Sequence, residues 1–150
     1  MALKAQLDND IKAALLGGDR FVAAVLRDFK AVILNEEVAQ KKRDEGLDDA
    51  SIEKLIAREV KKRQESAALY QQAGRAELAE NEVAESSVLE KYLPEQLSEA
   101  DIQAFIDEAI ATTGAAGPAA MGQVIGAVKA KVGNSADGAT IARLVKQSLS

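Results

Sequence analysis

The chain has 150 residues, of which 47% are hydrophobic and 29% charged, and its formal net charge is −5. This balance is typical of a globular protein with one domain or two small ones. The sequence contains no cysteine and no histidine, which excludes disulfides, thiolate catalysis and cysteine-ligated zinc. General-base chemistry near neutral pH would need a carboxylate or lysine with a strongly shifted pKa.

Apolar residues recur at helical spacing in the first part of the chain, and no strand-like alternation competes with that pattern. Apolar residues four positions apart, from Leu3 to Leu15, predict the buried stripe of a first helix that ends at Gly17-Gly18. Asp19 and Asp48 are suited to cap the second and third helices, because their carboxylates can accept hydrogen bonds from first-turn N–H groups.

A fourth helix is predicted between Gly74, which should close the third helix, and Pro94. We expect Leu78 to belong to its buried face. The helix should stop at Pro94, because proline lacks an N–H and pushes Leu93 out of the helical region.

A new helix is expected directly after this stop. Ser98 is suited to be its N-cap, and Leu97 and Ile102 occupy the positions of a hydrophobic staple. Two more short helices should follow, the first starting at Pro118 and the second capped by Asp137. The connections between them are short, so neighbouring helices should pack roughly antiparallel.

These elements predict an all-α fold with two domains. An N-terminal helical domain of about four helices should span residues 1–95, and a C-terminal three-helix domain should span residues 96–150. The joint between the two domains is predicted at Tyr92, Leu93 and Pro94.

Polar residues on the third and fourth helices could form a clasp between them. Because the fourth helix folds back after Gly74, its acidic side chains could face the donors of the third helix. A catalytic reading would need a general base, which the group lacks, so we interpret it as structural. Its members are Arg63, Ser66, Tyr70, Arg75, Glu82 and Glu85.

The end of the chain is locally basic. Residues 118–150 carry four bases against Asp137 as the single acid. Such a surface would contact phosphates and not base edges, and no spare aromatics are present to stack single-stranded bases. The candidate nucleic-acid-binding residues are Lys129, Lys131, Arg143 and Lys146.

From Val60 to Leu97 the sequence reads VKKRQESAALYQQAGRAELAENEVAESSVLEKYLPEQL. This stretch resembles the signature of the GatB/YqeY family of small helical proteins, and Met121-Gly122-Gln123-Val124 and Ala136-Asp137-Gly138 also fit it. The resemblance implies a C-terminal body similar to the tail of the B subunit of the tRNA-dependent aspartyl/glutamyl amidotransferase, a tail that contacts tRNA. Ser135 stands where many members carry a basic residue.

The resemblance suggests carbon–nitrogen ligase chemistry with glutamine as amide donor, but the chain has no nucleophile suited to it. The first hypothesis is therefore a non-catalytic tRNA-contacting module linked to tRNA amidation or translation. Its expected partners are tRNA and an aminoacyl-tRNA synthetase or amidotransferase subunits. The alternatives are a component of a glutamine-dependent carbon–nitrogen ligase and a protein–protein adaptor with an apolar groove between the two bodies.

We expect no cofactor and no metal site. No apolar run approaches the roughly 20 residues that a membrane-spanning helix needs, and the first residues lack the apolar region of a signal peptide. The sequence therefore predicts a cytoplasmic protein without a membrane partner.

Overall fold

The computed structural model of the protein describes residues 2–150, and within that range it consists of helices and connecting loops without a strand. The predicted all-α fold class is confirmed. The chain forms two compact units, one that ends at Leu93 and one that spans Pro94–Ser150. The helices are α1 (Ala2–Leu16), α2 (Arg20–Ala39), α3 (Asp49–Gln72), α4 (Ala76–Glu90), α5 (Glu99–Thr113), α6 (Met121–Val132) and α7 (Gly138–Leu149), with short 3-10 turns at Pro118–Ala120 and Gly133–Ser135.

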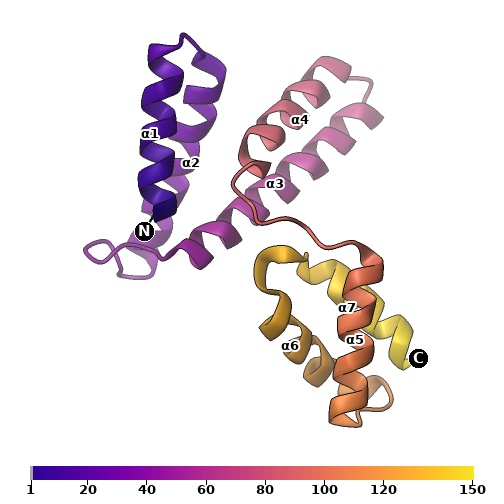
Figure 1. The fold of residues 1–150 in the computed structure, drawn as a ribbon. Helices are drawn as coiled ribbons and strands as arrows, with labels where there is room; N and C mark the ends of the chain where they lie inside the picture. The colour runs from indigo at the N-terminus through magenta and orange to yellow at the C-terminus, as the bar shows by residue number, and fades with distance from the viewer. Residues whose placement is uncertain (1) are drawn as a thin grey trace. The chain divides into compact units, whose positions relative to one another are not determined.

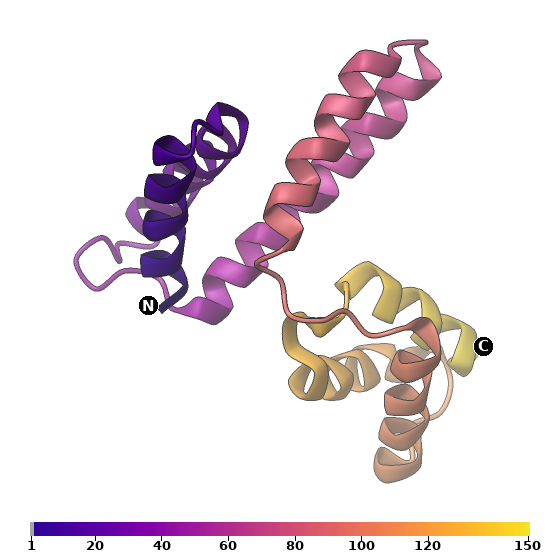
Figure 2. The ribbon, with the colours of Figure 1, turned by 45° about the horizontal axis from the view of Figure 1, so that its top comes forward.

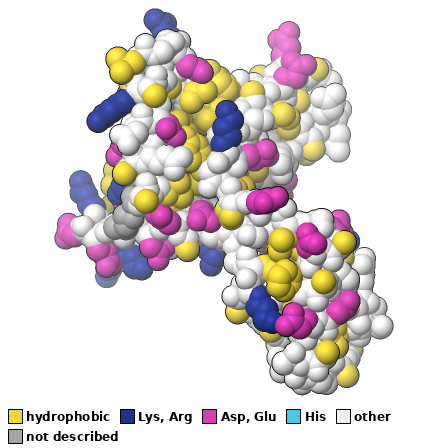
Figure 3. Space-filling model, in the orientation of Figure 1, with side chains coloured by type: hydrophobic (Ala, Val, Ile, Leu, Met, Phe, Trp, Pro, Cys, Tyr) yellow, Lys and Arg dark blue, Asp and Glu magenta, His cyan; other side chains and the backbone are white. Residues whose placement is uncertain are grey.

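The first unit is built from two helical hairpins, α1 with α2 and α3 with α4 (Figure 1). Its core contains Phe29 of α2, Ile56 of α3 and Leu89 of α4, which are almost completely buried. Figure 3 shows hydrophobic side chains gathered between the two hairpins. The outer parts of α3 and α4 run side by side beyond the first hairpin (Figure 2).

Local signals fix the starts of α2 and α3 and the end of α3 as predicted. Asp19 accepts a hydrogen bond from the N–H of Val22 at 3.1 Å, and Asp48 accepts one from the N–H of Ser51 at 2.8 Å. After α3, Gly74 adopts a left-handed φ of 73°. This conformation lets the next N–H, of Arg75, reach back to the carbonyl of Tyr70 at 2.8 Å and close the helix.

Two residues predicted to be buried are exposed. Leu15 is 53% exposed and Ala14 takes its place in the core. Steps of four residues turn by about 400°, so a row that starts at Leu3 drifts by about 120° before it reaches Leu15. Leu78 is 43% exposed because α4 begins in the outer part of the second hairpin, where two helices bury only a narrow stripe of each other.

The fourth helix ends earlier than predicted. Its last residue is Glu90, four positions before Pro94. A turn follows, in which Tyr92 and Leu93 pack against the first core. The restriction that proline places on Leu93 acts together with this packing, so the chain leaves the helix before the proline itself.

The second unit is a three-helix body with its own core. Ile106 of α5, Val128 of α6 and Val145 of α7 are fully buried in it. The predicted N-cap is confirmed, because Ser98 Oγ accepts a hydrogen bond from the N–H of Asp101 at 3.1 Å. Gly114 closes α5 with a left-handed φ of 68°.

In residues 2–150, no helix combines the length and the apolar character needed to cross a membrane.

Candidate functional site

The four predicted nucleic-acid-binding residues lie on α6 and α7 and are exposed. Lys129 and Lys131 belong to the last turn of α6, and Lys146 to the last turn of α7. The negative end of the helix dipole favours cations at these positions. Arg143 lies one turn before Lys146, so the two share a side of α7.

Two of the four cations are paired with acids of α5. Lys131 Nζ lies 2.8 Å from Glu108 Oε1, and Arg143 forms an ion pair with Glu99. The two glutamates are nine positions apart on α5, which places them on opposite sides of that helix. Lys131 and Arg143 therefore approach α5 from different sides and do not form one continuous patch with each other.

Lys129 forms no ion pair with any residue of the described range 2–150. Its ammonium lies against the first turn of α7, where a Cβ added to Gly138 would be 3.4 Å from the Lys129 Nζ. Asp137 is the N-cap of α7 but its side chain makes no capping hydrogen bond to the backbone. The carboxylate accepts instead from Thr140 Oγ1 at 3.3 Å. The Lys129 ammonium therefore lies next to the positive end of the α7 dipole.

The proposed clasp between α3 and α4 centres on Arg63. Its guanidinium contacts Glu59 Oε1 at 3.1 Å on the same helix and Glu85 Oε2 at 3.7 Å on α4. Desolvation by burial raises the pKa of Glu85, and the nearby Arg63 opposes that rise. Within residues 2–150, the Arg63 Nε is buried without a hydrogen-bond partner. Arg63 can therefore orient the carboxylates of Glu59 and Glu85.

The structure does not bring the other predicted clasp residues into this contact. The side chains of Ser66, Tyr70, Arg75 and Glu82 make no hydrogen bond or ion pair within the described range. A different polar contact joins the two helices: Glu90 of α4 accepts hydrogen bonds from Gln64 of α3 at 3.2 Å and from Ser86 at 3.1 Å. The sequence carries no signal for this contact, because its partners are set by the register between the helices.

The residues of the predicted joint are held on both sides of Pro94. Tyr92 donates a hydrogen bond from its hydroxyl to Asp10 Oδ2 at 2.5 Å, within the first unit. Burial and the neighbouring carboxylate raise the pKa of this tyrosine. Beyond Pro94, the N–H of Leu97 donates to the carbonyl of Ser135 at 2.8 Å, within the second unit. The chain between these two anchors is short.

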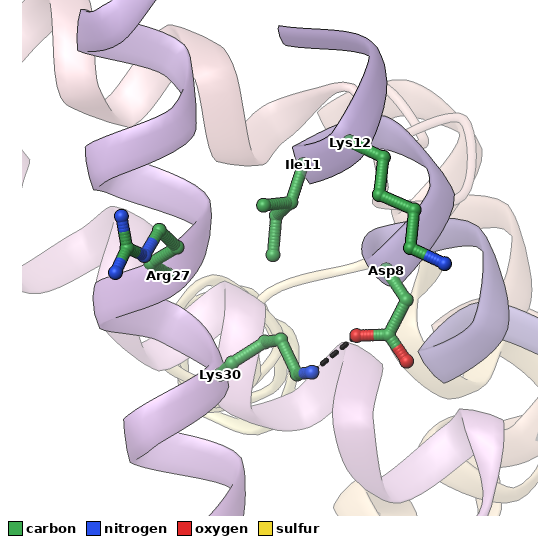
Figure 4. Close-up of a pocket in the computed structure, with 5 residues that line it drawn as sticks. All are labelled: Asp8, Ile11, Lys12, Arg27 and Lys30. Carbon is green, nitrogen blue, oxygen red and sulfur yellow. Dashed lines mark ion pairs between the residues drawn. The ribbon is translucent and has the colours of Figure 1, made fainter. Parts of the chain in front are cut away.

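A pocket between α1 and α2 was not anticipated from the sequence. It has a volume of about 540 Å³ and is lined by Asp8, Ile11, Lys12, Arg27 and Lys30 (Figure 4). Asp8 and Lys30 form an ion pair across it. No signal in the sequence could have found it, because the lining depends on how the two helices face each other.

Residues 2–150 contain no cluster of three or more acidic side chains placed to bind a metal ion.

Comparison with protein families matches residues 4–149 to the model described as Yqey-like protein, which is almost the whole chain. Comparison with curated proteins gives no match.

Proposed function

The chain belongs to the family of YqeY-like proteins, and from this membership we propose that it is a non-catalytic module that contacts tRNA. Its work would be connected with tRNA amidation or translation. The proposal draws on the resemblance between the C-terminal body and the tRNA-contacting tail of the amidotransferase B subunit. It assigns the contact to the second unit, Pro94–Ser150.

One observation carries the proposal. The ammonium of Lys129 lies beside Gly138, at a helix N-terminus whose N–H groups no side chain caps. Backbone N–H groups, the helix dipole and a lysine together favour a bound anion. A phosphate of the tRNA backbone is an anion of this kind. Ser135, close to this turn, adds no charge of its own, so Lys129 supplies the side-chain cation there.

The remaining cations can add to this contact at little cost. The ion pairs of Lys131 and Arg143 are half or more exposed, and exposed pairs are worth only about 0–1 kcal/mol. A phosphate can therefore replace Glu108 or Glu99 as the partner. Lys146 forms no ion pair within the described range.

A binding titration of the full chain with tRNA, at two salt concentrations, tests the proposal. We expect measurable affinity at low salt that falls steeply as salt rises, because each phosphate contact releases counterions. The double variant Lys129→Glu/Lys146→Glu should lower the affinity by about tenfold or more. The matched control is Arg20→Glu/Lys91→Glu, which changes the charge equally but alters exposed residues of the first unit.

Absence of tRNA binding by the unmodified chain at low salt would refute the proposal. So would an equal loss in both double variants, because that result would reflect net charge alone. The non-catalytic part has its own test. Pure protein added to glutamine, ATP and misacylated tRNA should give no amidated product, and formation of that product would favour the carbon–nitrogen ligase alternative.

A further inference from the structure

One face of α3 carries four cations in a row: Lys54, Arg58, Lys61 and Lys62, which we call the α3 stripe. All four are exposed. With about 100° of turn per residue, their side chains fall within an arc of about 100°. Buried residues of this part of α3, among them Ile56 and Val60, lie on the other side of the helix. From the α3 stripe we infer a second polyanion-binding surface, which contacts the phosphate backbone of helical RNA.

The acids in the described part of the chain do not neutralise the α3 stripe. None of its four residues forms an ion pair or a side-chain hydrogen bond within residues 2–150. Some other cations of the first unit do pair, such as Lys4 with Glu37 and Arg63 with Glu59, whereas Lys12 forms no ion pair within residues 2–150. What sets the α3 stripe apart is that four unpaired cations share one exposed face of a helix, in a unit where acids are plentiful.

The spacing along α3 also brings like charges together. Arg58 is four residues after Lys54 and three and four residues before Lys61 and Lys62. Like charges at these spacings destabilise a helix. The acid on the same face is Glu65, at the far end of the stripe, and it forms no ion pair with it. An arrangement that opposes helix stability without an internal partner fits an external polyanion.

The chemistry of the stripe favours a phosphate backbone over other anionic surfaces. A helix that lies on a membrane inserts an apolar face, but the apolar face of α3 is used in the core. The binding energy of protein–protein interfaces comes mostly from aromatic residues and other well-packed anchors. No aromatic residue lies among the four cations of the stripe. Lysine ammonium groups bind phosphates as point charges, and such contacts read the shape of an RNA helix and not its sequence.

The length of the stripe matches this partner. From Lys54 to Lys62 the helix rises by about 12 Å. A nucleic-acid duplex presents one charge per about 1.7 Å of its axis, so several phosphates lie within reach of the four cations. The inference goes beyond the proposed function, because it assigns an RNA contact to the first unit. The proposed function places its contact in the second unit.

The test measures binding of the full chain to a blunt RNA duplex of about 16 base pairs, the length that a double-stranded RNA-binding domain spans. Arg58→Glu should lower the affinity at low salt by about tenfold and reduce the slope of log affinity against log salt by about 1 to 2. The control Arg20→Glu makes the same charge change at an exposed residue that begins α2, and it should bind like the unmodified chain.

Stability gives a second readout with the opposite sign. The new carboxylate at position 58 would lie four residues before Lys62, the favourable order for a helical ion pair. Arg58→Glu should therefore raise the midpoint of urea unfolding while it weakens RNA binding. A loss of binding through misfolding would lower that midpoint instead, so the two causes are separable.

Unchanged duplex affinity in Arg58→Glu would overturn the inference. Equal losses in Arg58→Glu and Arg20→Glu would overturn it as well. Sedimentation with vesicles of anionic and neutral phospholipid adds an arm, and stripe-dependent binding to vesicles without binding to RNA would assign the surface to a membrane. The tail variant Lys129→Glu/Lys146→Glu separates the two proposals, since the effect of Arg58→Glu on the duplex should persist in that background whether or not the tail contacts tRNA.

Discussion

Lys4 of α1 forms an ion pair with Glu37 of α2, whose carboxylate-bearing side chain is only 2% exposed. The Lys4 Nζ lies 2.8 Å from one oxygen of Glu37 and 3.1 Å from the other. The N–H of Leu47, in the loop before α3, donates to the same carboxylate at 3.0 Å. One buried group therefore joins the first hairpin to the start of the second. Buried charges are tolerated when they are paired and hydrogen-bonded in this way.

Replacement of Lys4 should lower the stability of the fold, because the buried Glu37 carboxylate then loses its cation. In Lys4→Met the Glu37 carboxylate keeps the Leu47 N–H but loses its counter-ion. We expect the free energy of unfolding to fall by about 1.5–3 kcal/mol, the contribution of a hydrogen bond to a charged group. Urea unfolding at pH 7 measures it. Lys12→Met is the matched control, because Lys12 lies on the same helix, is exposed and forms no ion pair within residues 2–150. A change no larger than that of the control would contradict the prediction.

The same carboxylate should make stability depend on pH. The hydrogen bond from Lys4 is the main cause that lowers the pKa of Glu37 below its ordinary value of 4.5, and the Leu47 N–H adds to it. A carboxyl with a lowered pKa in the folded state stabilises the fold above the unfolded pKa and loses that effect as pH falls through the folded pKa. Unfolding in urea between pH 7 and pH 3 should show the unmodified chain losing more stability than Glu37→Gln.

Glu85 supplies a control of opposite sign. Burial raises its pKa, so its ionised form costs stability above that pKa, and the cost disappears as pH falls. Glu85→Gln should be at least as stable as the unmodified chain at pH 7. The difference in unfolding free energy between the two proteins should become smaller as pH falls. Parallel pH profiles for the two glutamine variants would argue against both assignments.

Tyr92 and Asp10 supply a second link in the first unit. The hydroxyl and the carboxylate are 2.5 Å apart, although the residues are separated by 82 positions. Tyr92→Phe keeps the ring and removes this hydrogen bond to a charged group, so we expect a loss of about 1.5 kcal/mol in unfolding free energy. Tyr70→Phe is the control, because its hydroxyl makes no hydrogen bond within the described range. Equal stability of the two variants in urea would show that the Tyr92 bond contributes nothing.

The predicted pair of domains can be tested by dividing the chain. The two hydrophobic clusters share no residue, so each unit carries a core of its own. We expect fragments 1–93 and 94–150 each to be helical by circular dichroism and to unfold cooperatively in urea. The shorter fragment should have the lower midpoint, because small domains bury a smaller part of their surface. An unfolded 94–150 fragment would show that the second unit depends on the first.

Most of the helix starts and ends could be predicted from the sequence. Asp19, Asp48 and Ser98 cap the helices as expected, because a capping side chain bonds to N–H groups within three residues. The predictions failed where burial depended on distant packing. Leu15 lies where the four-residue row has turned away from the buried face, and Leu78 lies where no second helix covers it.

The candidate sites were predicted less completely, and for a related reason. Lys131 and Arg143 were grouped by their position in the sequence, while the structure turns them toward Glu108 and Glu99 on α5. The buried charge of Glu37 carries no local signal, because a glutamate on a helix is most often solvated.

The sequence by itself determined that this protein is helical, where its helices are capped, and that it brings no thiol or imidazole to any reaction. Those properties depend on residue types and on contacts within one helical turn. Tertiary structure alone decided which charged side chains form ion pairs. Arg58 is one that forms none within residues 2–150. The reason is that an ion pair between helices requires two side chains from distant positions to meet, and packing of the apolar faces sets that meeting.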